Sequence, residues 1–338
     1  MSNSKSSQIL AASSPIAVKK FSINQFKGIL RWGLLRMADS RFEWISGCFE
    51  LALLLELSTT PKPGLVDRIH DYGETSYHHF LASAVSLRPW ITRAARLGRG
   101  RGLGKIILGG VKAFMSSQRG GNTHLGAWLL IAPMASAAGS SKRTPIKSTS
   151  LRSRVKRVLR SMDWRDTVNI FKAIAHASPG GLGRVPYLDV LREETYEEIE
   201  EERITPIQAL SAYRDYDVVA HEWVTGYSWT LGDCLRILKK NVREFEDLNA
   251  ALAQTFLEIL ARHRDTHIVR RAGRSMAEMV SSTASKVLEL GGVSTPAGRK
   301  ALTEFDRRIR RSRRLRPGSS ADLLSASLSA LLLEGFSP

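Results

Sequence analysis

The most apolar run of the chain reads Leu125-Gly126-Ala127-Trp128-Leu129-Leu130-Ile131-Ala132-Pro133-Met134-Ala135-Ser136-Ala137-Ala138. It has so few polar side chains that a helix formed here must be covered on all sides by other parts of the protein. The run contains Pro133 and falls short of the roughly 18 to 20 apolar residues that cross a membrane. It therefore predicts a buried core helix.

Helix-period patterns recur along nearly the whole chain on both sides of this segment. No stretch has the strict alternation and tight turns of a β-hairpin. The predicted fold class is therefore all-α. We expect helices at about 42–57, 74–95, 104–118, 123–138, 152–160, 164–177, 185–202, 206–227, 231–242, 244–263, 275–290, 295–311 and 320–333.

A chain of 338 residues with 43% hydrophobic content can form one large core. We expect a single large multi-helix domain over residues 39–338, with the polar segment 139–150 as a loop inside it. Residues 1–38 are serine-rich and hold six basic and no acidic side chains. They predict a disordered basic extension, and an organellar transit peptide is the alternative.

Positive charge is concentrated in one part of the chain. The net charge is +18, and residues 75–162 contain sixteen basic and no acidic side chains. Such a stretch predicts a field for a polyanion, which can be a nucleoside triphosphate, a coenzyme A derivative or nucleic acid. Cys48 and Cys234 lack metal-ligand spacing, so we expect reduced structural thiols in a cytoplasmic protein.

A rigid turn follows the first expected helix. It reads Thr59-Thr60-Pro61-Lys62-Pro63-Gly64-Leu65-Val66-Asp67-Arg68. Proline fixes φ and glycine allows close backbone approach, so the segment can hold its charged side chains in one geometry. An ordinary helix-ending turn is the alternative.

Two further motifs follow this turn in the chain. They read Gly120-Gly121-Asn122-Thr123-His124-Leu125-Gly126 and Pro317-Gly318-Ser319-Ser320-Ala321-Asp322-Leu323-Leu324. Together with the turn, they resemble the triphosphoribosyl-dephospho-coenzyme A synthase family in the family's own order, across roughly residues 40 to 336. The stretches that resemble its archaeal branch are 71–83, 178–183, 216–227 and 265–273.

The resemblance implies a transferase that moves the triphosphoribosyl group of ATP to the ribose 2′-hydroxyl of dephospho-coenzyme A and releases adenine. Positive charge develops at the anomeric carbon, so carboxylates are required. We expect Asp67 to be the catalytic base, with an N-cap or a salt bridge to Arg68 as the alternative. Glu56 is a second catalytic candidate if it is buried, and an exposed helix end if it is not.

The segment 120–126 opens a helix, where free amides and the helix dipole suit a phosphate. We expect Gly120, Gly121, Asn122 and Thr123 to bind the triphosphate. His124 is a candidate for donating to a phosphate or protonating adenine, and a capping histidine is the alternative. Additional triphosphate partners are expected at Lys62, Arg68 and Lys112.

A ligand set for Mg²⁺ is expected from four carboxylates that flank the motifs. They are Asp71, Glu74, Asp265 and Asp322. Asp71 and Glu74 can instead cap the following helix, and Ser320 is expected as the N-cap of the last helix. Asp265 is expected at the end of a long helix.

Other functions stay open at this point. The segment 69–75 departs from the Gly-Ala-His-x-Asp-Met pattern of the family's citrate-lyase branch, and Leu125 stands where that branch has lysine, so a transferase with another acceptor is one alternative. A helical polyanion or nucleic-acid binder that uses the basic stretch from Arg88 to Arg160 is another, although no aromatic residues interleave with it. The expected partners are ATP and dephospho-coenzyme A, without a membrane, and a homo-oligomer is compatible with the sequence.

Overall fold

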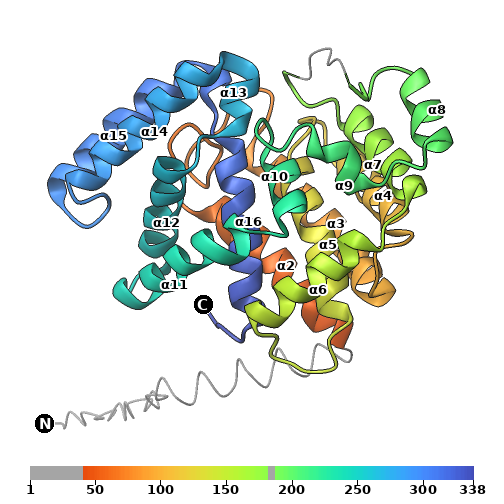
Figure 1. Ribbon diagram of the computed structural model, residues 1–338. Helices are drawn as coiled ribbons and strands as arrows, with labels where there is room; N and C mark the ends of the chain where they lie inside the picture. The colour runs from red at the N-terminus through yellow and green to blue at the C-terminus, as the bar shows by residue number, and fades with distance from the viewer. Residues whose placement is uncertain (1–40, 182–186) are drawn as a thin grey trace, which may run out of the picture. The chain divides into compact units, whose positions relative to one another are not determined.

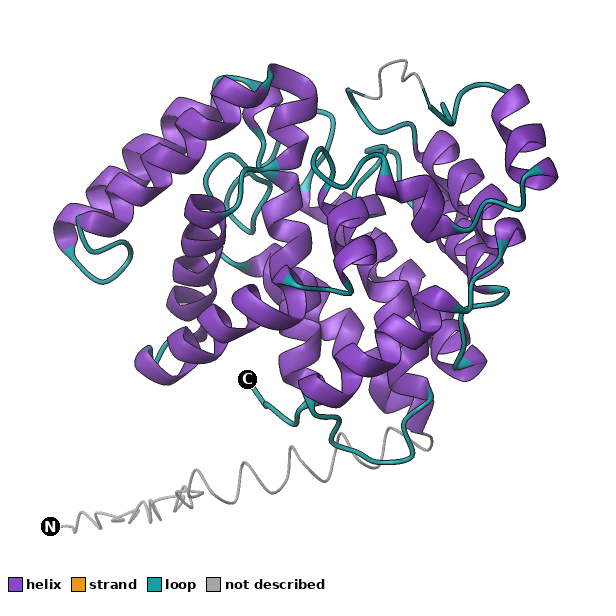
Figure 2. Cartoon of the chain, in the orientation of Figure 1, coloured by secondary structure: helices purple, strands orange, loops and turns teal. Residues whose placement is uncertain are grey.

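The computed structural model describes residues 41–181 and 187–338. Every named element in these two ranges is helical (Figure 2), and the one β-bridge that they contain is an isolated pair between Tyr72 and Thr75. The all-α prediction is confirmed. The predicted extension over residues 1–38 lies outside the described residues, as do the first residues of the helix expected at 185–202.

The apolar run forms the core helix α5, Leu125–Gly139. All its residues except Gly126 are buried. Small side chains let its neighbours approach closely: a β-carbon at Gly139 would lie 1.8 Å from the carbonyl oxygen of Ala95 in α3, Tyr77–Leu97. The helix is therefore covered on all sides, as its composition predicted, with large side chains such as Trp128 and small ones such as Gly139 both packed in the interior.

A second core helix, α16 (Gly318–Leu333), brings the two ends of the described chain together. It packs against α5, against α2 (Arg41–Ser58) and against α12 (Leu248–Arg262) (Figure 1). Its residues from Leu323 to Leu333 are all buried. Residues from the first and last described helices therefore meet in the interior.

The other helices surround this pair. Those that follow α3 in the first half are α4 (Leu103–Ser116), α6 (Ser148–Arg160), α7 (Trp164–Ala177), α8 (Glu194–Glu201), α9 (Pro206–Ser211) and α10 (Val218–Thr225). The second half adds a π-helical turn η1 (Trp229–Cys234), α11 (Leu235–Glu244), α13 (Thr266–Ala272), α14 (Arg274–Glu289), α15 (Pro296–Arg310) and a 3₁₀ turn η2 (Arg313–Leu315).

Three expectations about the helices were wrong. The single helix expected at 206–227 is two helices, because Asp217 accepts hydrogen bonds from the amides of Val219 and Ala220 and starts α10 anew. The helix expected at 185–202 is described only as the shorter α8. Asp265 does not end a long helix but caps α13, which was not expected at all.

The segment 139–150 is also shorter as a loop than predicted. Helix α6 already begins at Ser148. Ile146 is buried, and its amide donates a 2.7 Å hydrogen bond to the carbonyl oxygen of Leu333. The loop is thus tied to the end of α16. Both cysteines are free and buried, as predicted.

None of the described helices combines the length and apolar character that a bilayer-crossing segment needs.

Candidate functional site

Asp67 lies at the centre of the rigid turn and has no exposed surface. Its carboxylate accepts hydrogen bonds from the hydroxyl of Thr60 (3.1 Å), the amides of Ile69 and His70 (2.9 Å each) and the His70 ring (3.0 Å). Nη2 of Arg310 lies 3.6 Å from Oδ2. Burial alone would raise its pKa, but these hydrogen bonds leave the pKa of Asp67 lowered. Such contacts are typical of an ionised group that organises a turn.

The turn is held against α15. The amide of Gly64 donates a 2.7 Å hydrogen bond to Asp306, and Asp306 accepts a further 2.7 Å bond from Arg310. Gly64 has a φ of +73°, and a β-carbon there would lie 2.7 Å from Cδ1 of Ile309. The glycine is therefore required both by its backbone conformation and by the close approach of α15.

Lys62 and Glu56 form a buried ion pair beneath the turn. Lys62 is 1% exposed, and its Nζ donates a 2.6 Å hydrogen bond to the carbonyl oxygen of Glu56 as well as pairing with Oε1 of the same residue. Burial raises the pKa of Glu56, and the Lys62 charge opposes that rise. Glu56 is thus buried at the end of α2, and Lys62 already has a counter-charge.

His124 precedes α5 and is 3% exposed. Its ring packs edge-on against Phe80, with 5.1 Å between the centroids, and its Nδ1 is buried without a hydrogen-bond partner. Burial and the Lys62 charge lower the pKa of His124 to about 3. The imidazole is therefore neutral near pH 7 and holds no extra proton to give to adenine.

The rest of the 120–126 segment builds the start of α5. The Asn122 side chain accepts a 3.1 Å hydrogen bond from the amide of Leu125, and Thr123 donates a 2.7 Å bond to Ser83. A β-carbon at Gly120 would lie 2.4 Å from the His79 ring, whereas Gly121, with a φ of +75°, faces open space. These contacts favour capping at Asn122, and the predicted phosphate binding stays a prediction.

Asp265 and Asp322 are both buried near the start of α16. Asp265 accepts from the amide of Ile268 (3.1 Å) and from the amide and hydroxyl of Ser320 (2.8 and 2.9 Å). Ser320 therefore binds Asp265 and is not the N-cap of α16, a position that Pro317 occupies.

Asp322 has few partners for a buried carboxyl. It is 9% exposed and accepts a hydrogen bond from the amide of Ala127. It packs directly on α5, because a β-carbon at Gly126 would lie 2.1 Å from its Oδ2. Burial, reinforced by the negative charges of Asp265 and Glu56, raises the pKa of Asp322 well above its ordinary value. This carboxyl group favours its protonated form.

The four predicted Mg²⁺ ligands do not come together. Asp71 accepts a 2.6 Å hydrogen bond from the amide of Tyr77 at the start of α3, which is the capping alternative. Glu74 is exposed and forms an ion pair with Arg313. Across residues 41–181 and 187–338, no three Asp, Glu, His or Cys side chains form a group that could hold a metal ion. In the described residues, these four carboxylates therefore do not form a magnesium site.

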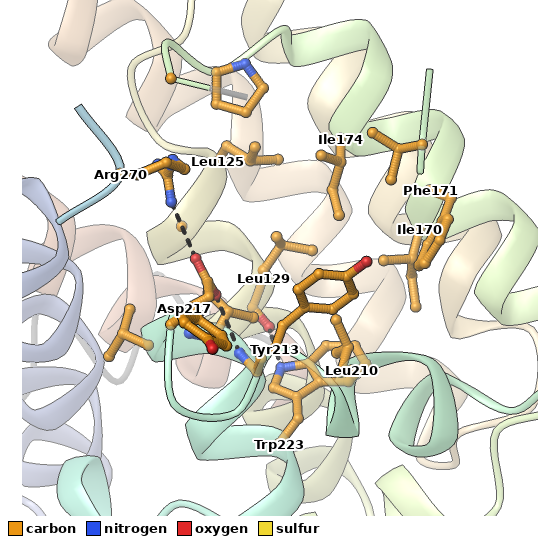
Figure 3. A pocket seen from close by; sticks show the side chains of 18 of the residues that line it. Leu125, Leu129, Ile170, Phe171, Ile174, Leu210, Tyr213, Asp217, Trp223 and Arg270 are labelled. Atoms are coloured by element: carbon orange, nitrogen blue, oxygen red, sulfur yellow. Dashed lines mark hydrogen bonds and ion pairs between the residues drawn. The ribbon is translucent and has the colours of Figure 1, made fainter. Parts of the chain in front are cut away.

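Figure 3 shows a pocket of about 680 Å³, and Asp322 is one of the residues that line it. Its wall is mostly apolar and comes from α5, α7, α9 and α10. The labelled apolar side chains are Leu125, Leu129, Ile170, Phe171, Ile174, Leu210 and Trp223. Its polar lining includes Asn122, Tyr213, Asp217, Arg270 and Asp322.

Two of the predicted site residues, Asn122 and Asp322, line this pocket. Arg270 and Asp217, which form a 3.1 Å ion pair at its edge, were not predicted. The signal for them was present, since both lie in the stretches 216–227 and 265–273 that resemble the archaeal branch.

The predicted basic groups lie elsewhere. Arg68 and Lys112 are exposed and do not line the pocket. No basic residue from the stretch Arg88 to Arg160 lines it either. Some of these arginines are matched by acidic residues from outside the stretch, such as Arg88 with Glu50 at 2.6 Å.

Comparison with known proteins shows which family the chain resembles. The model of the ATP:dephospho-CoA triphosphoribosyl transferase family matches residues 42–337. The chain is 28% identical over 300 residues to the 2-(5''-triphosphoribosyl)-3'-dephosphocoenzyme-A synthase of Klebsiella pneumoniae, covering 84% of this chain and 89% of that protein. It is 26% identical over 299 residues to a Salmonella gallinarum protein assigned the same name, covering 84% and 88%.

A solved structure shares the fold. It is the crystal structure of an Archaeoglobus fulgidus protein assigned to the triphosphoribosyl-dephospho-coA synthases, with a TM-score of 0.58 and 23% identity. The likeness covers 75% of this chain and 99% of that one. With the family model matching nearly all of the described residues, the chain belongs to the ATP:dephospho-CoA triphosphoribosyl transferase family.

Proposed function

We propose that this protein transfers the triphosphoribosyl group of ATP to the 2′-hydroxyl of dephospho-coenzyme A, and that the reaction takes place in the pocket beside Asp322. Family membership supports the reaction. One observation supports the place: a buried carboxyl group borders a pocket of about 680 Å³, which is large enough for a nucleotide.

The atoms of the reaction balance without a further reactant. The bond between C1′ of the ATP ribose and N9 of adenine breaks, and its electron pair leaves with adenine, which takes up one proton. C1′ forms a new bond to the 2′-oxygen of the acceptor, which loses one proton. The two proton transfers cancel.

Asp322 is the proposed proton carrier. Its surroundings favour the protonated form, so it can give a proton to departing adenine. The carboxylate left behind is the charge that stabilises the oxocarbenium-like ribosyl group. The acceptor hydroxyl then returns a proton to Asp322. His124 is less suited to this role, because its low pKa leaves it neutral.

We propose positioning roles for the residues around the turn. The hydrogen bonds that surround Asp67 and the counter-charge on Lys62 leave these groups engaged with the protein. They hold the turn that covers Glu56 and that packs against α15. Magnesium, if the reaction uses it, would enter with the ATP phosphates.

The test is a product analysis. Purified protein is incubated with ATP, Mg²⁺ and dephospho-coenzyme A, and free adenine and ADP are separated by chromatography. We expect adenine without ADP, formed only when the acceptor is present. Asp322→Asn should lower adenine release by about a hundredfold or more, in line with loss of a proton donor. The exposed Glu304→Gln in α15 serves as the control.

The proposed reaction would be contradicted if ADP were released from ATP. It would also be contradicted if no adenine were released with dephospho-coenzyme A or with any other nucleotide offered as acceptor. Adenine release with another acceptor but not with dephospho-coenzyme A would favour the alternative acceptor. The apolar Leu125 in the pocket wall, where the citrate-lyase branch has lysine, is the observation behind that alternative.

A further inference from the structure

Arg271 and Arg316 do not line the pocket themselves, and neither has a carboxylate partner among the described residues. Arg270, the residue before Arg271 in α13, lines the pocket and pairs with Asp217. Most other arginines of this region have a partner: Arg310 contacts Asp306 at 2.7 Å, and Arg313 pairs with Glu74. Within the described parts of the chain, no ion pair joins Arg271 or Arg316 to an acidic side chain.

Several guanidinium nitrogens here are buried without a partner. Nε of Arg270 and both Nε and Nη2 of Arg316 are inaccessible to solvent and make no hydrogen bond. The Arg316 guanidinium lies over the ring of Tyr72, 3.4 Å from its centroid. Buried donors are almost always satisfied in proteins. The open Nε of Arg270, a residue that lines the pocket, and the open donors of Arg316 therefore point to a ligand that accepts from them.

Arg271 contacts a segment that lines the pocket. Its Nε donates a 3.1 Å hydrogen bond to the carbonyl oxygen of Gly180, and Pro179 and Gly181 on either side are lining residues. Burial and the nearby charges of Arg270 and Arg316 lower the pKa of Arg271. Arg270 lines the pocket, and the positive charges of Arg271 and Arg316 lie close enough to one another to be unfavourable. An anion bound beside them would offset that repulsion.

We propose that Arg270, Arg271 and Arg316 form an anion subsite at the pocket edge that binds the triphosphate chain of ATP. The inference rests on the proposed function for the identity of the anion. Arginine presents planar donor pairs that match phosphate oxygens, and three of them suit a chain with several negative charges. The apolar depth of the pocket then receives the base, and Asp322 lies on the wall near the ribose.

This assignment differs from the one that the sequence predicted. Lys62 is paired with Glu56, and Lys112 is exposed on α4 away from the pocket lining. The three arginines come instead from α13 and from the segment just before α16. The two assignments can be separated by substitution.

The experiment measures binding of inorganic tripolyphosphate by calorimetry, without any turnover. Arg271→Gln is the primary variant, because Arg271 is partly exposed and its loss should leave the fold intact. Arg316→Gln is the second. Each should weaken binding by at least about tenfold, as expected for a lost charged hydrogen bond. Arg308→Gln, at an exposed position of α15, removes the same charge and should change affinity less than about twofold.

Wild-type affinity in a folded Arg271→Gln protein, or a loss in Lys112→Gln instead, would overturn the subsite. The outcome is independent of the reaction. If tripolyphosphate binding falls in the arginine variants while no adenine is released from ATP, the subsite stands and the proposed function fails. If adenine is released from ATP but the arginine variants bind tripolyphosphate with wild-type affinity, the proposed function stands and the subsite fails.

Discussion

The carboxyl group of Asp322 should lower the stability of the fold at neutral pH, whereas the proposed reaction requires it. The pKa of this buried carboxyl is raised in the folded protein above its ordinary value of 3.8. Its contribution to the stability of the fold is therefore fully present below pH 3.8, where the group is protonated in both the folded and the unfolded state. That contribution is lost as the pH rises toward the folded pKa. An Asp322→Asn variant would keep the shape of the side chain without its charge. We therefore expect this variant to have a higher melting temperature than the wild type at pH 8 and a nearly unchanged one at pH 4, while adenine release is lost. Thermal unfolding at the two pH values measures this, and a lower melting temperature at pH 8 would contradict it.

Asp67 offers a contrasting case. Its pKa is lowered in the fold, so its contribution to stability is present above the ordinary value of 3.8 and is lost as pH falls below it. Asp67→Asn removes the negative charge opposite Arg310. The one remaining side-chain oxygen can serve the amides of Ile69 and His70, but the new NH2 group then replaces the acceptor of the Thr60 hydroxyl. We expect a loss of about 2 to 4 kcal/mol in the free energy of unfolding, measured with urea at pH 7. If stability is unchanged but turnover falls by about a hundredfold, Asp67 is the catalytic base that its place in the sequence motif suggested.

The imidazole ring of His124 should stay neutral at and around neutral pH. Its pKa of about 3 lies below the ordinary 6.5, so the neutral ring stabilises the fold above pH 6.5 and this contribution is lost as pH falls toward 3. In a histidine NMR titration, the His124 ring signals should not shift between pH 8 and about pH 5. A midpoint near 6.5 would return His124 to the list of proton donors for adenine.

Helix packing carries a prediction at the scale of elements. Helices α5 and α16 touch where Gly126 faces Asp322, with only 2.1 Å between a β-carbon and Oδ2. Gly126→Ala should therefore displace the carboxyl and lower adenine release by about tenfold or more, the effect of a small misplacement at a reacting centre. Gly47 in α2 has nothing within 4 Å of its β-carbon position. Gly47→Ala should raise the free energy of unfolding by about 0.5 to 1 kcal/mol with activity unchanged.

Elements with strong periodicity were predictable from sequence. Helix α7 was placed at its observed bounds, Trp164–Ala177, because Asp163 caps it and its apolar face repeats regularly. The break between α9 and α10 was missed because both helices contain apolar residues, and the turn at 212–217 between them holds no proline or glycine to mark it. Asp217 ends that turn and caps α10. Short α13 was missed because its side chains His267, Arg270 and Arg271 are polar. The two arginines bind distant segments, Arg270 at Asp217 and Arg271 at the carbonyl oxygen of Gly180.

For the molecule as a whole, the motifs identified the family but not the arrangement of charges within the site. Periodicity predicted the all-α fold, and the three motifs predicted the family that the match over residues 42–337 confirms. The sequence could not tell that Lys62 is neutralised by Glu56 or that Asp71 and Asp265 serve as caps. Those pairings depend on tertiary contacts, and a positive stretch in sequence need not border the pocket it was expected to serve.

The positions of Glu56 and Asp322 in the sequence also matter while the protein is being synthesised. Glu56 lies near the beginning of the described chain and Asp322 on its last helix, with the core helix α5 between them. A ribosome must therefore synthesise nearly the whole chain before this carboxyl group can reach the pocket. An unfinished copy that still lacks α16 also lacks the proposed proton carrier, so we expect it to release no adenine from ATP.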